Sequence, residues 1–148
     1  MFIRERRIPM IPLESSLENI DGSFQTVDRL FNEVGFNLGG GYEYDHGYYD
    51  KALDWEENKE HQAYLRVPVT AIEGSIGTRQ AVLRIGKPFV LMHKFRKGPA
   101  KNTSTGLLSG SFNQFTEPVD KDAGIDKKWL ERAQSELNQL ERRFNQKL

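Results

Sequence analysis

The sequence predicts an α+β protein, in which an N-terminal helix and a long C-terminal helix pack on an antiparallel sheet of about five strands in a meander. Three observations predict this class. Apolar residues alternate at strand spacing between residues 37 and 96, they recur at three-to-four spacing in residues 25–34 and 126–145, and the breaks between strands are short. Short breaks favour antiparallel neighbours, because parallel strands need long crossover connections.

The first predicted helix covers residues 25–34. Ser23 or Thr26 can cap its start, because a hydroxyl oxygen accepts a hydrogen bond from a free N–H of the first turn. Gly35 supplies the residue after the end, where the backbone takes a left-handed conformation. The apolar residues of this segment fall on one helix face: Val27, Leu30, Phe31 and Val34.

The predicted strands cover residues 37–45, 48–55, 61–69, 80–86 and 88–96. The reversal between the first two falls on Asp45-His46-Gly47, and Gly47 is expected there as a turn residue with a positive φ. The other breaks also carry turn residues: the polar residues 56–60, then Glu73-Gly74-Ser75, then Gly86-Lys87-Pro88.

The last predicted helix, residues 126–145, has the clearest periodicity. Its polar face places opposite charges one turn apart, at Lys127/Glu131 and at Arg132/Glu136. The stripe lasts only about two heptads, which favours a helix packed on the sheet of its own domain over a coiled coil. A contact in a homodimer is the alternative that the sequence leaves open. The stripe consists of Leu130, Ala133, Leu137, Leu140 and Phe144.

The domain boundaries follow from length and composition. With 148 residues, the chain has the length of one ordinary domain, which we place at residues 10–148 after an N-terminal extension at residues 1–9. Residues 98–124 predict a long loop rich in Gly, Ser, Thr and Asn. Four large apolar side chains predict that this loop docks on the body of the protein: Leu107, Leu108, Phe112 and Phe115.

Composition disfavours several classes of function. The 21 basic and 21 acidic residues balance, so no net field attracts nucleic acid or an anionic membrane surface. No apolar run reaches the roughly 20 residues of a membrane span. The absence of cysteine removes disulfides and thiolate metal sites, and it is typical of a cytoplasmic protein. His46, His61 and His93 lack the spacing of a metal motif, so we expect neither a metal nor a cofactor.

Several short motifs, taken in order, resemble the YugN-like family of small bacterial proteins of unassigned function. The resemblance implies a compact α+β domain in the cytoplasm of a Gram-positive, Bacillus-like bacterium, and it implies no activity. Family members begin near Met10, so residues 1–9 stand outside the pattern. The matching pieces are MIPL (residues 10–13), GGGYEYDHG (39–47), YLRVP (64–68), LRIGKPF (83–89), His93 and NQF (113–115).

Strand parity places candidate site residues on one sheet face. Leu65 alternates with Tyr64 and Arg66, and Leu83 alternates with Arg84, so the two arginines face away from the aliphatic set. Arginines from neighbouring strands suit a carboxylate or phosphate ligand. The alternative is that both arginines form ordinary cross-strand ion pairs with Glu43, Asp50 or Asp54. The strand register across residues 86–88 is not fixed by the sequence, so which sheet face carries His93 is left open.

Two functions from different classes remain. The first is a non-catalytic binding or regulatory domain that holds a peptide or a small anionic ligand. Its candidate ligand-binding residues are Tyr44, Asp45 and His46 of the glycine- and tyrosine-rich segment 39–49, together with Tyr64, Arg66, Arg84 and His93. The second is a small hydrolase-like enzyme that uses His46 or His93 as a general base with a neighbouring carboxylate. An enzyme of this kind requires a histidine and a carboxylate within hydrogen-bond reach inside a concave site.

Overall fold

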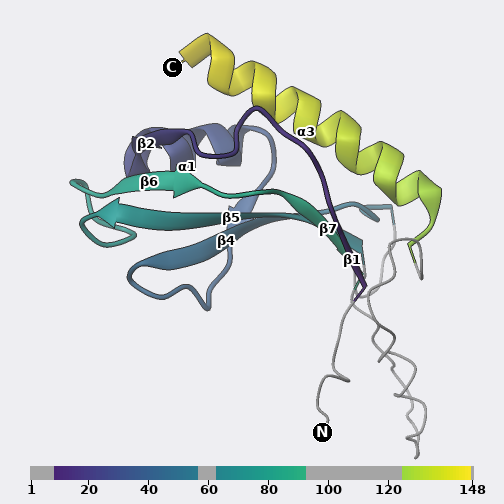
Figure 1. Cartoon of the computed structure of the whole chain (residues 1–148), viewed down its shortest axis with the longest axis horizontal. Coiled ribbons are helices and arrows are strands. Elements are labelled where there is room, and N and C mark those ends of the chain that lie inside the picture. Colours follow the sequence, from purple (N-terminus) through teal and green to yellow (C-terminus); the bar gives the residue numbers. More distant parts are fainter. Residues whose placement is uncertain (1–8, 57–62, 93–124, 148) are drawn as a thin grey trace, which may run out of the picture.

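The structure is a computed structural model that describes residues 9–56, 63–92 and 125–147. Two helices lie on one face of an antiparallel sheet (Figure 1). The elements, in chain order, are β1 (Met10–Pro12), β2 (Asp21–Ser23), α1 (Phe24–Glu33), β3 (Asn37–Leu38), β4 (His46–Ala52), β5 (Ala63–Glu73), β6 (Val82–Ile85), β7 (Phe89–Met92) and α3 (Lys127–Lys147).

The long strand β5 lies at the centre of the sheet. Along one edge it pairs with β4, which in turn pairs with β3. Along the other edge, its first part pairs with β7 and its second part with β6, and these pair outward with β1 and β2. All these pairs are antiparallel, which confirms the predicted class. Among the described residues, the sheet has seven strands rather than about five, because β1 and β2 are only three residues long and too short for alternation to show in the sequence.

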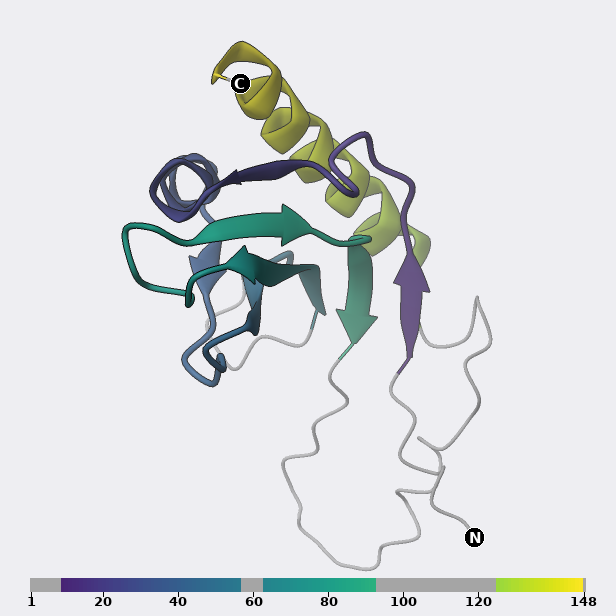
Figure 2. The same ribbon diagram turned by 60° about the vertical axis from the view of Figure 1, so that its left-hand side comes forward.

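Strands β6 and β7 depart from a simple meander. The chain does not reverse at residues 86–88. Instead, β7 continues in the direction of β6 along the same edge of β5, and it bends away from β6 to run beside β1 (Figure 2). The Gly86 N–H donates a hydrogen bond to the carbonyl of Pro68 in β5 at 2.8 Å. This bond holds the residues between β6 and β7 beside β5. Turn residues in a sequence mark a break in a strand, but they do not specify whether the chain reverses there.

The reversal before β4 falls one or two residues earlier than predicted. Glu43 and His46 form the bridge that closes the turn, and the Glu43 N–H donates to the His46 carbonyl at 2.8 Å. Gly47 therefore lies within β4, buried, and it is not among the glycines with a positive φ. The expectation of a turn glycine at this position was wrong. A β-carbon at Gly47 would lie 2.8 Å from Cβ of Tyr42, so close packing is what favours glycine here.

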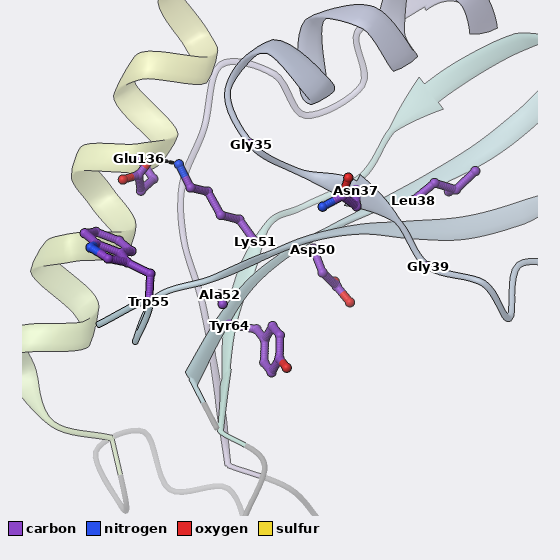
Figure 3. A pocket seen from close by; sticks show the side chains of 10 residues that line it. All are labelled: Gly35, Asn37, Leu38, Gly39, Asp50, Lys51, Ala52, Trp55, Tyr64 and Glu136. Atoms are coloured by element: carbon purple, nitrogen blue, oxygen red, sulfur yellow. Dashed lines mark hydrogen bonds and ion pairs between the residues drawn. The ribbon is translucent and has the colours of Figure 1, made fainter. Parts of the chain in front are cut away.

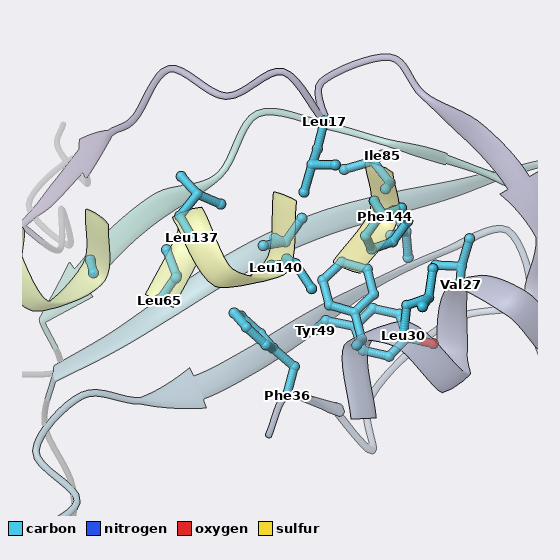
Figure 4. Close-up of a cluster of buried hydrophobic side chains, with 14 of the residues drawn as sticks. Leu17, Val27, Leu30, Phe36, Tyr49, Leu65, Ile85, Leu137, Leu140 and Phe144 are labelled. Carbon is cyan, nitrogen blue, oxygen red and sulfur yellow. The ribbon is translucent and has the colours of Figure 1, made fainter. Parts of the chain in front are cut away.

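Helix α1 begins and ends as its sequence predicts. The Ser23 side chain caps the start by accepting a hydrogen bond from the Thr26 N–H at 3.2 Å, and Gly35 ends the helix with a φ of +95°. The buried face of α1 meets the sheet and α3 in the hydrophobic core (Figure 4). Phe31 of α1 contacts three other aromatic rings there. The Phe31 ring stacks on Tyr49 of β4 at 4.2 Å, and it contacts Phe36 and Phe144 edge to face.

Helix α3 packs on the sheet and on α1, as predicted. Ala133, Leu137, Leu140 and Phe144 are buried in the core, and Leu130 is partly buried against it. The charges on its polar face have other partners than those expected. Arg132 donates to Glu56 and to the Leu53 carbonyl, and Glu136 accepts from Lys51 of β4. These contacts fasten the first half of α3 to the end of β4.

Several predicted features lie outside the described residues. These are residues 1–8 of the N-terminal extension, most of residues 56–60, the end of the strand at 88–96 with His93, and the loop at residues 98–124. In the part of the chain that the structure describes, no helix is long and apolar enough to cross a membrane.

Candidate functional site

The pairing between β3 and β4 ends after two residues, and this ending shapes the candidate site. Asn37 pairs with Asp50 and Leu38 with Tyr49. The next two pairs would join Phe36 to Lys51 and Gly35 to Ala52, but the chain leaves α1 through a turn at Gly35, whose φ is positive, and the ladder stops at Asn37. The two strands therefore diverge at Ala52.

The divergence leaves a backbone edge on β4. The Gly39 N–H donates to the Tyr48 carbonyl, so the polar backbone groups of Tyr48 face β3. Because these groups alternate in direction along a strand, those of Ala52 face the same side. Among the described residues, none forms a backbone hydrogen bond with Ala52 on that side. One N–H donor and one C=O acceptor are thus presented beyond the end of β3.

A cavity of about 640 Å³ opens at this point, and we call it the ladder-end cavity (Figure 3). Its volume lies within the range of sites for small ligands, about 300 to 1,000 Å³. It extends around the edge of β4, with α3 on one side and the sheet face opposite the helices on the other (Figure 3). Its lining residues are Gly35, Asn37, Leu38, Gly39, Asp50, Lys51, Ala52, Trp55, Tyr64 and Glu136.

Lys51 provides the cation of the ladder-end cavity. Its Nζ donates to Glu136 Oε1 at 2.6 Å and to the Val34 carbonyl at 2.8 Å, so it joins β4 to α3 and to the end of α1. A β-carbon at Gly35 would come within 3.2 Å of Cε and Nζ of Lys51, so glycine at this position leaves the side chain its room. An ammonium has three N–H donors, and these two bonds use two of them.

Trp55 provides an aromatic wall. The indole is 49% exposed, although it lies beside α3 and carries the Arg132 guanidinium 4.3 Å from its ring centroid. Arg132 also pairs with Glu56 and donates to the Leu53 carbonyl, which holds the segment after β4 against α3. The ring is therefore held in place while half of its surface stays open to a ligand.

The predicted residues Tyr64 and Arg66 lie on the sheet face opposite the helices, away from the aliphatic set, as strand parity indicated. Arg66 donates two hydrogen bonds to Asp50, at 2.8 and 2.9 Å, and its guanidinium lies 4.6 Å from the Tyr48 ring centroid. The hydrogen bond to Asp50 raises the pKa of Arg66. Tyr64 and Asp50 line the ladder-end cavity, whereas Arg66 stands next to it and neutralises Asp50.

Arg84 lies on the same face as Arg66 but at a different place along β5. Arg84 pairs with Thr70 and Arg66 with Phe89, so four residues of β5, about 13 Å, separate the two positions. Arg84 donates two hydrogen bonds to Asp21, at 2.7 and 3.0 Å. Each arginine thus has its own bidentate carboxylate, which is the geometry of the ion-pair alternative, although Asp21 was not among the partners predicted.

The turn residues Tyr44, Asp45 and His46 lie apart from the ladder-end cavity. His46 Nδ1 lies 2.9 Å from Asp45 Oδ1, but both side chains are more than half exposed. Neither residue lines the ladder-end cavity. The pair has the reach that an acid–base site needs, but both of its side chains stand open to solvent. In residues 9–56, 63–92 and 125–147, no three His, Asp or Glu side chains gather in a group that could hold a metal ion.

Sequence reasoning missed the principal residues of the ladder-end cavity. Lys51, Ala52 and Trp55 come from the end of β4 and the residues after it, Glu136 comes from α3, and no short motif joins the two segments. One signal was available, since Lys51 is a charged residue at an inward position of a half-buried strand. A charge at such a position requires a partner from another element.

Comparison with known proteins finds relatives over nearly the whole chain. The model of the "YugN-like family" matches residues 12–144. "Uncharacterized protein YugN" of Bacillus subtilis (strain 168) is 36% identical over 132 residues, which are 89% of this chain and 96% of that protein. "Uncharacterized protein YlbA" of the same organism is 29% identical over 85 residues, 57% of this chain and 68% of that protein.

A solved structure shares the fold. The crystal structure of the uncharacterized conserved protein YugN from Geobacillus kaustophilus HTA426 matches with a TM-score of 0.63 and 21% sequence identity. The match covers 93% of this chain and 96% of that chain. At this identity the likeness extends to the fold alone, so the chemistry of a site has to be argued from the residues of this chain.

Proposed function

The chain belongs to the YugN-like family, and we propose that it is a non-catalytic binding domain that holds a peptide or a small anionic ligand in the ladder-end cavity. The observation that carries this proposal is the combination of the Lys51 ammonium with the exposed ring of Trp55 around a space of about 640 Å³. Ligand sites typically join apolar walls to a few polar groups that fix orientation.

The charges of the ladder-end cavity support an anionic group over a cationic one. Its two carboxylates already have partners, because Asp50 is paired with Arg66 and Glu136 with Lys51. The remaining hydrogen-bonding capacity includes donors: the third N–H of Lys51 and the backbone N–H of Ala52. A carboxylate ligand accepts from both kinds of donor, and a bond between charged partners is stronger than a neutral one.

The position of the site supports binding without catalysis. The pair considered for an enzyme, Asp45 and His46, does not line the cavity. The carboxylates that do line it, Asp50 and Glu136, are each engaged in an ion pair. As part of this proposal we assign the domain to the cytoplasm, since it has no cysteine for the disulfides typical of small exported domains.

Native mass spectrometry of the full chain, purified without denaturation from a Bacillus host, tests the proposal. We expect a population whose mass exceeds that of the polypeptide by a small ligand. We expect the Ala52→Phe variant to lose this population, because a phenyl ring at position 52 occupies the cavity.

The matched control is Thr70→Phe, which adds the same ring on β5 at an exposed position outside the cavity lining. This variant should keep the bound mass. A bound mass that Ala52→Phe retains would place the ligand elsewhere and contradict the proposal, and so would the absence of any bound mass from the wild-type protein.

A further inference from the structure

The ladder-end cavity offers a ligand the backbone partners of a missing strand. It occupies the space where β3 would continue beside β4 if the chain did not turn at Gly35. The Ala52 N–H and C=O face this space, and within the described residues neither has a backbone partner there. An extended peptide is the ligand class that supplies one acceptor and one donor at the spacing of a strand.

The cation of the cavity lies at the same place. Lys51 Nζ stands beside Gly35, close enough that a β-carbon on Gly35 would be 3.2 Å away, and Gly35 faces Ala52 across the cavity. A peptide that continues the line of β3 therefore brings one of its groups to the ammonium. The end of a peptide that complements an ammonium is its carboxylate, which can accept from Lys51 and from a backbone N–H together.

The wall of the cavity offers an apolar surface to one side chain of the peptide. The open half of the Trp55 ring and the small side chain of Ala52 leave an apolar surface next to the strand edge. Aromatic rings that are held in place bind apolar or aromatic side chains with little loss of conformational entropy.

From these three features we infer that the ladder-end cavity binds the carboxyl-terminal residues of an extended peptide, with an apolar last or penultimate side chain against Trp55. This inference rests on the proposed function and names its ligand. The peptide pairs with the edge of β4 at Ala52, and its terminal carboxylate accepts from Lys51.

The test compares two libraries of N-acetylated tripeptides, one with free carboxyl termini and one with the same sequences amidated. Binding to the ¹⁵N-labelled full chain is followed by the NMR shifts of the Ala52 amide and the Trp55 indole. We expect free acids with an apolar residue to move both signals and to bind at least about tenfold more tightly than their amides, which corresponds to one charge-assisted hydrogen bond.

Each other outcome overturns the inference in a distinguishable way. Equal binding of acids and amides keeps the proposed function but removes the role of the carboxylate. Binding of acetate alone, with no gain from the peptide, indicates a site for small anions. If neither library moves these signals while native mass spectrometry finds another ligand in the cavity, the peptide inference fails and the proposed function stands.

The backbone contact is tested by Ala52→Pro with Ala52→Val as its control. Proline removes the N–H at an edge position where the sheet does not use it, whereas valine adds similar bulk and keeps the donor. We expect Ala52→Pro to weaken the best free acid about tenfold and Ala52→Val to weaken it much less. An equal effect of both variants would assign the loss to bulk and contradict the backbone contact, and the acid–amide comparison on the wild-type protein does not depend on either variant.

Discussion

At the scale of single residues, close packing at Gly47 determines what the hairpin tolerates. A β-carbon there would lie 2.8 Å from Cβ of Tyr42 and 3.3 Å from Cδ1 of Leu38. We predict that Gly47→Ala lowers the free energy of unfolding by about 1 to 3 kcal/mol, the usual cost of overpacking. Urea denaturation measures this change.

Gly40→Ala is the control for Gly47, because a β-carbon at Gly40 meets no atom within 4 Å. This second substitution should leave the free energy of unfolding within about 0.5 kcal/mol of the wild-type value. Equal effects of the two substitutions would show that the close contact at Gly47 is absent in solution.

Tyr49 gives the fold a dependence on alkaline pH. Burial, with the hydrogen bond to Asp28 at 2.6 Å, raises the pKa of Tyr49 above its ordinary value of 10.0. Above that value the unfolded chain loses the proton and the folded chain keeps it. The free energy of unfolding should therefore fall by up to about 1.4 kcal/mol for each pH unit above about pH 10, and this stabilisation is fully present below that pH.

The Tyr49→Phe variant isolates this dependence. Losing the hydroxyl should cost about 1 to 2 kcal/mol at neutral pH, because it removes the hydrogen bond to Asp28. The difference between wild type and variant should shrink between about pH 9 and pH 11, as measured by urea denaturation at each pH. A difference that stays constant over this range would contradict the assignment to Tyr49.

At the scale of elements, the ion pair between Lys51 and Glu136 fastens α3 to the sheet. Both side chains are largely buried, and the Glu136 side chain is 10% exposed. We predict that Lys51→Met costs about 2 to 4 kcal/mol of the free energy of unfolding, since it leaves a carboxylate without its partner in a dry environment. Chemical denaturation followed by circular dichroism measures the loss.

The double variant Lys51→Met with Glu136→Leu separates the two causes of that loss. It should recover most of the stability, because replacing both charges by apolar groups removes the desolvation cost as well as the attraction. A double variant as unstable as Lys51→Met would mean that the lysine acts through its bond to the Val34 carbonyl rather than through the ion pair.

The two arginines on the sheet face opposite the helices should differ in their contribution to stability. Arg66 is partly buried and joins Asp50 to the Tyr48 ring, whereas Arg84 and Asp21 form an exposed pair. We predict that Arg66→Gln lowers the melting temperature more than Arg84→Gln does, because exposed ion pairs are screened by solvent. A larger effect of Arg84→Gln in thermal unfolding would contradict this ranking.

Much of the element structure follows from local sequence signals. The alternation of Leu65 and Arg66 sets which face of β5 is buried, and the periodic stripe of α3 selects the side chains that enter the core. The end of α1 follows from Gly35, a residue whose positive φ is inexpensive only for glycine. Each of these features depends on neighbours in the chain, which is why the sequence could predict them.

The remaining features depend on pairing between distant segments. β1 and β2 become strands because they add to the outer edge of β7 and β6, and three residues carry no periodic signal of their own. The ladder-end cavity arises where β3 leaves β4 and α3 approaches, so it depends on three elements at once. Arg84 pairs with Asp21 because β2 lies beside β6, a neighbour that the sequence did not predict.

At the scale of the whole molecule, helices α1 and α3 cover one sheet face, and the ladder-end cavity opens where that cover meets the sheet edge. Lys51, whose ion pair with Glu136 fastens α3 to the sheet, also lines this cavity. Binding and stability are therefore linked, since a ligand that binds only the folded chain raises the free energy of unfolding by mass action.

The central claim is that ligands bind in the ladder-end cavity, and an NMR screen of the ¹⁵N-labelled full chain with a library of small carboxylic-acid fragments tests it most directly. We expect the hits to move the backbone signals of Gly35, Asn37 and Ala52 and the indole signal of Trp55, and to leave the signals of the turn at Tyr44 to His46 unchanged. Hits that instead concentrate on that turn or around Arg84, or a screen that moves no cavity signal, would contradict it.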